Sequence, residues 1–267
     1  MIQIFRKWIS RLFKEKNKHS SKGESDLVIG YYLDTWHNYR IAEPIIVDIS
    51  KAINSNVLIC GASGSGKSYF ELQLLARLVQ MEPDGEFIFA DFKGDDSFRF
   101  LKDCSNYHSY YNTLDALEYV YERLKKRQSG EDDTRNQITL VIDEYVAFIL
   151  AEQGKDKKEA GIIMNKVGEL LLLGRSMKIR VICTCQRAES AVFTAGARIN
   201  FCFVIILGSF NKTSYDMLFG EYDPLVKNRV FNRGEGSLQI DGRELIFIKA
   251  STIEDFSKIE EICRRGL

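Results

Sequence analysis

The residues with the clearest chemistry form a glycine-rich loop: Gly61, Ala62, Ser63, Gly64, Ser65, Gly66, Lys67 and Ser68. They match G-x-x-x-x-G-K-S, a pattern that binds nucleotide phosphates when a buried strand precedes it and a helix follows it. The glycines let backbone N–H groups face the phosphates, and the helix N-terminus adds partial positive charge. We therefore expect Lys67 to reach the β- and γ-phosphates of ATP, and Ser68 to be a ligand of Mg²⁺.

A second candidate is the acidic pair Asp143 and Glu144, which directly follows the apolar run 138–142. In phosphate-loop enzymes the first such acid holds Mg²⁺ through water, and an adjacent acid can polarise the attacking water. Adjacent acids are common by chance, but these follow a hydrophobic run in a chain that already carries a phosphate loop. We predict that Asp143 belongs to a metal site and that Glu144 is a catalytic base, with ATP and Mg²⁺ as cofactors.

The third candidate is Gln186, in the sequence Cys185-Gln186-Arg187 at the end of the next apolar run. The carboxyl ends of the strands in an open α/β sheet converge on the ligand, so Gln186 is predicted to contact the γ-phosphate or its attacking water. The alternative is a polar strand-end residue that caps the next turn.

These candidates need a framework that brings them to one edge of a sheet. Continuous apolar runs typical of buried parallel strands occur at 57–60, 86–90, 138–142, 179–183 and 201–207. Helical periodicity separates them, at 67–81, near 96–103, at 113–127 and in one long segment that reaches 173. This alternation predicts an α/β fold with a mostly parallel sheet covered by helices on both faces.

Shorter elements are expected on either side of this core. Residues 44–49 read as a short strand before it. After it, Asp241 and Gly242 predict a tight hairpin between strands at 237–240 and 244–248. A closing amphipathic helix is expected from Thr252, with Phe256 among its inward residues.

Composition sets further limits. The chain has 267 residues, 45% of them hydrophobic, which suits one large core. Its 37 basic and 37 acidic residues cancel, so any nucleic-acid surface must be local. The six cysteines show no paired spacing and read as core residues in a reducing cytosol. No stretch approaches the roughly 20 apolar residues of a membrane span, and we expect a cytoplasmic protein.

The N-terminal segment differs from the rest. Residues 1–26 are predicted as a basic amphipathic helix and a polar linker, and 27–267 as the main domain. The helix is suited to an anionic membrane surface or to DNA backbone, which would make the protein peripheral at the membrane. Docking on its own domain or on a partner protein is an equally open interpretation.

The ordered set of motifs resembles the FtsK/HerA family of DNA-pumping ATPases. The resemblance rests on the phosphate loop, Val-Ile-Asp-Glu at 141–144, Gly-Arg-Ser-Met-Lys-Ile at 174–179 and Thr-Cys-Gln-Arg at 184–187, together with Asp91-Phe92-Lys93-Gly94. It is most similar to the FtsK/SpoIIIE-type motors of Gram-positive conjugative plasmids and integrative elements. The resemblance implies a RecA-like core, a hexameric ring and ATP-driven movement of DNA through its pore.

The resemblance also assigns roles by position. Lys67 and Ser68 would bind nucleotide and Mg²⁺, Asp143 and Glu144 would be the acidic pair, and Gln186 would be the sensor.

Two arginines are candidates for a residue supplied to the neighbouring subunit. Arg175 matches the position at which the family often carries an arginine finger, and Arg198 is the rival candidate. Both could instead be surface arginines. Asp91 and Lys93 match positions to which we assign a structural or subunit-coupling role.

The leading hypothesis is an ATP-dependent DNA translocase that serves transfer or maintenance of a plasmid or mobile element. It would contact DNA backbone without reading sequence, and a relaxase, replication or membrane-channel partner could bind the basic N-terminus. The alternatives are a viral genome-packaging ATPase of the same superfamily and an ATP-dependent switch protein that pumps nothing. We expect neither the multi-span membrane region nor the winged-helix module of the cell-division translocases in this chain, which is predicted to be a bare motor.

Overall fold

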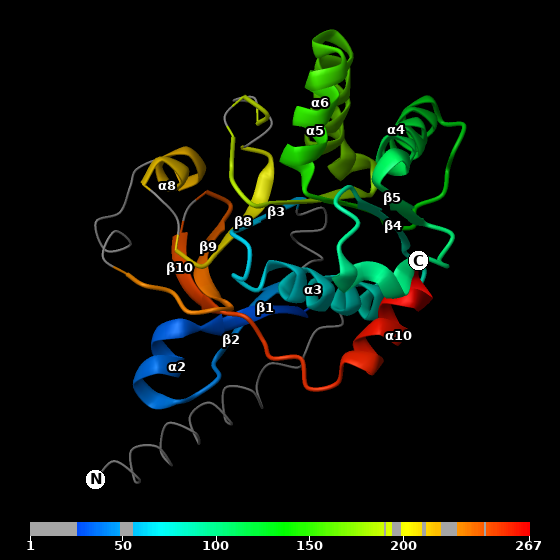
Figure 1. Ribbon diagram of the computed structural model, residues 1–267. Coiled ribbons are helices and arrows are strands. Elements are labelled where there is room, and N and C mark those ends of the chain that lie inside the picture. Colours follow the sequence, from blue (N-terminus) through cyan, green and yellow to red (C-terminus); the bar gives the residue numbers. More distant parts are fainter. Residues whose placement is uncertain are drawn as a thin grey trace, which may run out of the picture.

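The apolar runs of the sequence form the centre of a ten-stranded sheet, in the order β2-β1-β10-β9-β8-β3-β7-β6-β4-β5 (Figure 1). The computed structural model describes residues 26–48, 56–189, 191–193, 199–209, 212–219, 229–242 and 244–267. The basic segment 1–25 and Arg198 lie outside the described residues, so the expectations for them stay predictions.

One half of the sheet is parallel, as the buried apolar runs predict. Each pairing among its members runs in the same direction, so all their carboxyl ends lie along one edge. The strands are β3 (Asn56–Gly61), β4 (Glu86–Asp91), β5 (Tyr107–Ser109), β6 (Ile138–Asp143), β7 (Ile179–Cys185) and β8 (Phe201–Leu207).

The other half is antiparallel and continues the sheet beyond β8. Its strands are β1 (Asp26–Tyr32), β2 (Pro44–Asp48), β9 (Glu235–Ile240) and β10 (Glu244–Lys249). The predicted hairpin is confirmed, because Asp241 and Gly242 join β9 to β10 with positive φ angles of 50° and 67°. The run predicted at 44–49 forms the edge strand β2 over its described residues, and β1 is a strand that was not predicted from the sequence.

Helices cover both faces of the sheet, which confirms the predicted layers (Figure 1). Alternate side chains of the parallel strands lie on opposite faces of the sheet. In β3, Val57 and Ile59 pack toward one set of helices, and Leu58 and Cys60 pack toward the other. The first face holds α3 (Lys67–Met81), the 3₁₀ helix η1 (Asp96–Leu101) and α10 (Phe256–Gly266). The second face holds α4 (Thr113–Ser129), α5 (Tyr145–Lys155) and α6 (Lys157–Leu173).

The remaining short elements lie in the connections. They are α2 (Leu33–Tyr39), η2 (Tyr110–Asn112), η3 (Gly174–Met177) and α8 (Lys212–Phe219). Within the described ranges, each helix is too short or too polar to traverse a lipid bilayer.

The long helical segment expected up to residue 173 is in fact two helices. Asp156 has extended backbone angles, ends α5, and accepts hydrogen bonds from the amides of Lys158 and Glu159 as the N-cap of α6. The closing helix likewise begins later than Thr252, because Asp255 caps it by accepting from the Lys258 amide. Phe256 is correspondingly 40% exposed and not inward as predicted.

Candidate functional site

The glycine-rich loop follows β3 and leads directly into α3, as its pattern requires. Gly66 is the residue before α3 and has a φ of 98°, which favours glycine because a Cβ there would be strained. The loop closes on itself through a hydrogen bond from the Ser65 amide to the Ala62 carbonyl (3.0 Å). Its backbone therefore lies at the N-terminus of a 15-residue helix, where N–H groups and the helix dipole favour an anion.

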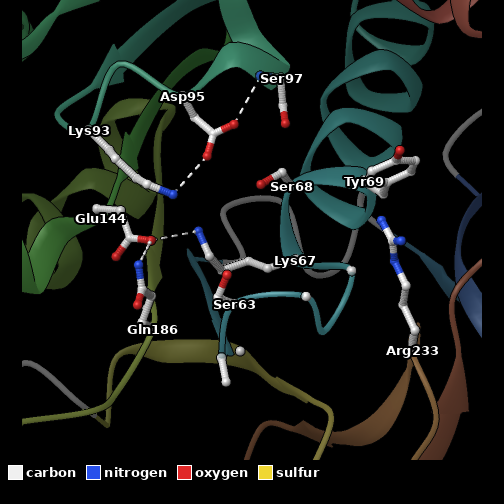
Figure 2. Close-up of a pocket in the computed structure, with 14 residues that line it drawn as sticks. Ser63, Lys67, Ser68, Tyr69, Lys93, Asp95, Ser97, Glu144, Gln186 and Arg233 are labelled. Carbon is white, nitrogen blue, oxygen red and sulfur yellow. Dashed lines mark hydrogen bonds and ion pairs between the residues drawn. The ribbon is translucent and has the colours of Figure 1, made fainter.

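Lys67 is buried and is held between the two acids that follow β6. Its Nζ donates to Asp143 Oδ1 at 2.9 Å. The same Nζ forms an ion pair with Glu144 Oε1 at 3.2 Å (Figure 2). Burial lowers the pKa of Lys67, but the nearby acids, among which Asp143 has the largest effect, together raise it more, so the net pKa lies above that of a free lysine. Lys67 is thus a cation inside the protein.

A hydroxyl from β7 links the lysine to the acids. Thr184 Oγ1 accepts from Lys67 Nζ at 3.1 Å and from the Glu144 amide at 3.2 Å, and it donates to Asp143 Oδ1. All four groups are buried, so their polar atoms satisfy one another. Thr184 was not predicted as a site residue.

Glu144 is positioned by an uncommon backbone conformation. It has a φ of 56° and a ψ of 44°, the left-handed region, between the end of β6 and the start of α5. Strained residues of this kind cluster at functional sites. Its Oε1 accepts from Gln186 Nε2 at 3.1 Å, so the sensor candidate directly contacts the candidate base (Figure 2).

The opposite wall of the cleft comes from the connection after β4. Asp91 is fully buried and accepts from the Gly94 amide (2.7 Å), the Asp95 amide (3.3 Å) and the Tyr107 hydroxyl (2.7 Å). Lys93 pairs with Asp95 at 2.8 Å within this connection. The structural role predicted for Asp91 therefore has a physical basis in these contacts.

A third wall comes from the segment before β9. The Gly234 amide donates to the Ser65 carbonyl at 2.8 Å, which joins this segment to the phosphate loop. Its neighbour Arg233 stacks over the Tyr69 ring, with 4.8 Å between the guanidinium carbon and the ring centroid (Figure 2).

Together these walls enclose a cleft with a volume of about 180 Å³. Pockets that hold a whole drug-sized ligand measure roughly 300–1,000 Å³, so this cleft suits a phosphate chain better than a complete nucleotide. Its lining residues are Gly61, Ala62, Ser63, Gly64, Gly66, Lys67, Ser68, Tyr69, Lys93, Asp95, Ser97, Glu144, Gln186 and Arg233.

The donor set fits Mg²⁺. Ser68 lines the cleft at the start of α3, and Asp143 ends β6, which is separated from β3 by β7 alone. Both offer oxygen atoms, which this cation prefers. Among the described residues, no cluster of three or more His, Cys, Asp or Glu side chains could hold a metal. Mg²⁺ at this site would therefore depend on water and substrate phosphate for most of its ligands, as it commonly does.

One buried acid beside the cleft has no role in these contacts. Glu71 lies one turn after Lys67 on α3, is 2% exposed, and neither carboxylate oxygen has a hydrogen-bond partner among the described residues. Burial raises its pKa well above the ordinary glutamate value, and the nearby charge of Asp143 raises it further.

Arg175 lies away from the cleft. It is exposed in η3, just before β7, whereas the cleft forms where β7 ends. Strands rise about 3.3 Å per residue, so the length of β7 separates Arg175 from Gln186 by about 20 Å. The structure thus brings together Lys67, Asp143, Glu144 and Gln186, but not Arg175.

Several lining residues were missed by the sequence reasoning. Lys93 was noticed in the Asp-x-Lys-Gly pattern but was not assigned to the cleft. Strands β4 and β6 pair so that Asp91 lies opposite Asp143. This pairing brings the connection after β4, which carries Lys93, beside Glu144. Tyr69, Asp95, Ser97 and Arg233 had no sequence signal of comparable strength.

Similarity to known proteins agrees with this site. No protein-family model matches the chain. Over 193 residues it is 26% identical to the FtsK domain-containing protein YdcQ of Bacillus subtilis (strain 168), and the match covers 65% of this chain and 38% of YdcQ. The chain therefore spans well under two thirds of that relative.

Solved structures share the fold, among them two ATPase-related proteins of known origin. The pCW3 conjugation coupling protein TcpA with ATPγS has a TM-score of 0.70 at 19% identity, over 92% of this chain and 71% of TcpA. The cytoplasmic domain of the type VII secretion ATPase EccC from Thermomonospora curvata has a TM-score of 0.68 at 19% identity, over 93% of this chain and 32% of that one. The fold is that of the RecA-like P-loop ATPases.

Proposed function

The chain is an FtsK-like P-loop ATPase in its fold, and on that premise we propose that it hydrolyses ATP to move DNA. The observation that carries the proposal is the convergence of a phosphate loop, a buried lysine, two acids and a glutamine at adjacent strand ends. Lys67 contacts both acids, and Glu144 contacts Gln186.

In this proposal Glu144 is the general base. Its carboxylate accepts a proton from the water that attacks the γ-phosphate, and Gln186 orients the carboxylate and the water. Lys67 releases Asp143 and binds the β- and γ-phosphates, where it offsets the charge of the transition state. Ser68 and Asp143 would hold Mg²⁺, which neutralises phosphate charge as a Lewis acid when bound.

DNA is the proposed cargo because the match in sequence is to an FtsK domain-containing protein, and because one structural neighbour is a conjugation coupling protein. The shared fold with a secretion ATPase does not by itself separate DNA from a polypeptide cargo. With no net charge on the chain, we propose local basic contacts to DNA backbone that are independent of sequence. Transfer of a plasmid or mobile element is the process proposed.

The proposed assembly is a homo-oligomeric ring, with six subunits as the expected number. Because Arg175 is exposed and about 20 Å along β7 from its own cleft, it would reach the γ-phosphate of a neighbouring subunit and not its own. The basic residues 1–26 would hold the ring at a membrane or at a partner such as a relaxase or channel protein.

The test is the ATP hydrolysis rate with and without double-stranded or single-stranded DNA, with mass determination in the presence of a non-hydrolysable analogue. We expect hydrolysis that DNA accelerates, together with a nucleotide-dependent oligomer. Hydrolysis that no DNA affects would contradict the proposed cargo, and absence of hydrolysis under all conditions would contradict the enzyme.

A further inference from the structure

A second lysine lines the cleft on the wall that faces Lys67. Lys93 comes from the connection between β4 and η1, and its ammonium group points into the space in front of Ser68 and Glu144 (Figure 2). The pairing of β4 with β6 explains this position: Asp91 lies opposite Asp143, so Lys93 and Glu144 both follow paired strand ends.

The connection that carries Lys93 is held by the protein itself. The buried carboxylate of Asp91 accepts from the amides of Gly94 and Asp95 and from the Tyr107 hydroxyl. Gly94 has a φ of 68°, which allows the sharp turn directly after Lys93. The backbone of Lys93 is therefore fixed beside the cleft.

The ion pair between Lys93 and Asp95 is weak enough for a phosphate to replace Asp95. Its Nζ lies 2.8 Å from Asp95 Oδ2, with the lysine side chain 49% exposed and the aspartate 21% exposed. Exposed ion pairs contribute little, because water screens them and side-chain entropy opposes them. Asp95 has other contacts, since its Oδ1 accepts from the Ser97 amide at 2.9 Å as the cap of η1. Losing Lys93 would leave that cap in place.

We propose that Lys93 is a further catalytic residue, which leaves Asp95 and binds the γ-phosphate from the side opposite Lys67. The inference rests on the proposed ATP hydrolysis. Two acids, Asp95 and Glu144, line the cleft, and Asp143 lies beside it in contact with Lys67. The other cations of the lining are Lys67 and Arg233, and the guanidinium of Arg233 stacks over the Tyr69 ring. A second ammonium group offsets charge on the γ-phosphate oxygens, and it does so without gaining or losing a proton.

The structural alternative is a solvated lysine that only braces its own connection through Asp95. The two interpretations differ in one respect that can be measured. A bracing lysine affects ADP and ATP analogues equally, whereas a lysine that binds the γ-phosphate affects only nucleotides that carry this group.

The experiment measures the affinity of the full chain for ADP and for the β,γ-imido analogue of ATP. For Lys93→Met we expect affinity for the analogue to fall about tenfold, equivalent to about 1.4 kcal/mol. Affinity for ADP should stay within about twofold, a change below about 0.4 kcal/mol. Lys102→Met is the matched control, because Lys102 is exposed directly after η1 and does not line the cleft. It should change neither affinity.

A second variant gives a change of opposite sign. Asp95→Asn keeps the oxygen that accepts from Ser97 but removes the charge that holds Lys93, so affinity for the analogue should rise while ADP affinity changes less. Removal of a negative charge alone could raise affinity too. The double variant separates these effects, because the gain should shrink when residue 93 is methionine.

Equal effects of Lys93→Met on ADP and on the analogue would overturn the inference, as would an undiminished gain in the double variant. If the unaltered chain binds neither nucleotide, the proposed function fails, and the role of Lys93 fails with it. If the unaltered chain binds both and Lys93→Met leaves their affinity ratio unchanged, only the inference about Lys93 is wrong.

Discussion

The ammonium group of Lys67 and the Oδ1 atom of Asp143 lie 2.9 Å apart, with both side chains buried. Each charge therefore depends on the other for its compensation inside the protein. Removing one partner of such a pair leaves an uncompensated buried charge, which is far more costly than removing both. The relationship connects the stability of the domain to the residues proposed to bind nucleotide.

Lys67→Met should abolish nucleotide binding and lower the free energy of unfolding by about 3 kcal/mol, because Asp143 loses its partner. Adding Asp143→Asn should restore part of that stability but none of the binding. Urea denaturation and nucleotide titration measure the two effects. Lys126→Met, at an exposed position on α4, is the control and should change neither. Equal stability of the single and double variants would show that the pair is not coupled.

Thr184→Val keeps the shape of the side chain but removes the hydroxyl that links Lys67, Asp143 and the Glu144 amide. We expect a loss of about 1–3 kcal/mol in unfolding free energy, because buried polar groups lose a partner. The hydrolysis rate should fall as well, since Glu144 loses a backbone contact. Thr184→Ser retains the hydroxyl and should recover both. Normal activity of the valine variant would contradict this account of the site.

Glu71 should make stability depend on pH. Burial raises its folded-state pKa above the unfolded value of about 4.5, so its contribution is complete below that pH and is lost as the pH rises. Glu71→Gln should therefore reduce the fall in unfolding free energy between pH 5 and pH 8. Glu122→Gln, at an exposed position on α4, should leave that fall unchanged. A steeper fall in Glu71→Gln would mean that Glu71 is charged and compensated in the folded chain.

Arg175 and the cleft of its own subunit lie at opposite ends of strand β7. A role for Arg175 in the neighbouring subunit can be tested by mixing two variants. Arg175→Ala has an intact cleft without the arginine, and Glu144→Gln has the arginine without the base. Each should hydrolyse ATP poorly alone, and mixing them should restore activity, because one subunit completes the cleft of the other. Arg135→Ala, exposed in the loop after α4, should be active alone. No recovery on mixing would argue against Arg175 acting between subunits.

The sequence predicts the parts of the fold that depend on local patterns. Lys67–Met81 has the predicted bounds, because the glycine loop and a regular helical period both mark them. The break at Asp156 was missed, although Gly154 and a capping aspartate are local signals for it. Strand β1 was missed although Leu27, Val28 and Ile29 form an apolar run, and its place in the sheet depends on pairing with β2, nearby in sequence, and with β10, which is distant.

The site residues also divide into those that local sequence patterns predict and those that depend on contacts between distant segments. Lys67, Asp143, Glu144 and Gln186 were predicted because each follows a buried strand, and parallel strands bring their ends together. Arg233 was not predictable in this way. Its place at the cleft depends on long-range contacts: the Gly234 amide donates to the Ser65 carbonyl, and Arg233 stacks over Tyr69, which joins segments about 170 residues apart.

The most direct test of the account is the ATP hydrolysis rate of Glu144→Gln beside its nucleotide affinity. Glutamine keeps the size of the side chain but cannot accept the proton of the attacking water, so the rate should fall about 100-fold or more. Nucleotide affinity should be retained, because Lys67 and the phosphate loop remain. Hydrolysis by Glu144→Gln at the rate of the unaltered chain would contradict the proposed site.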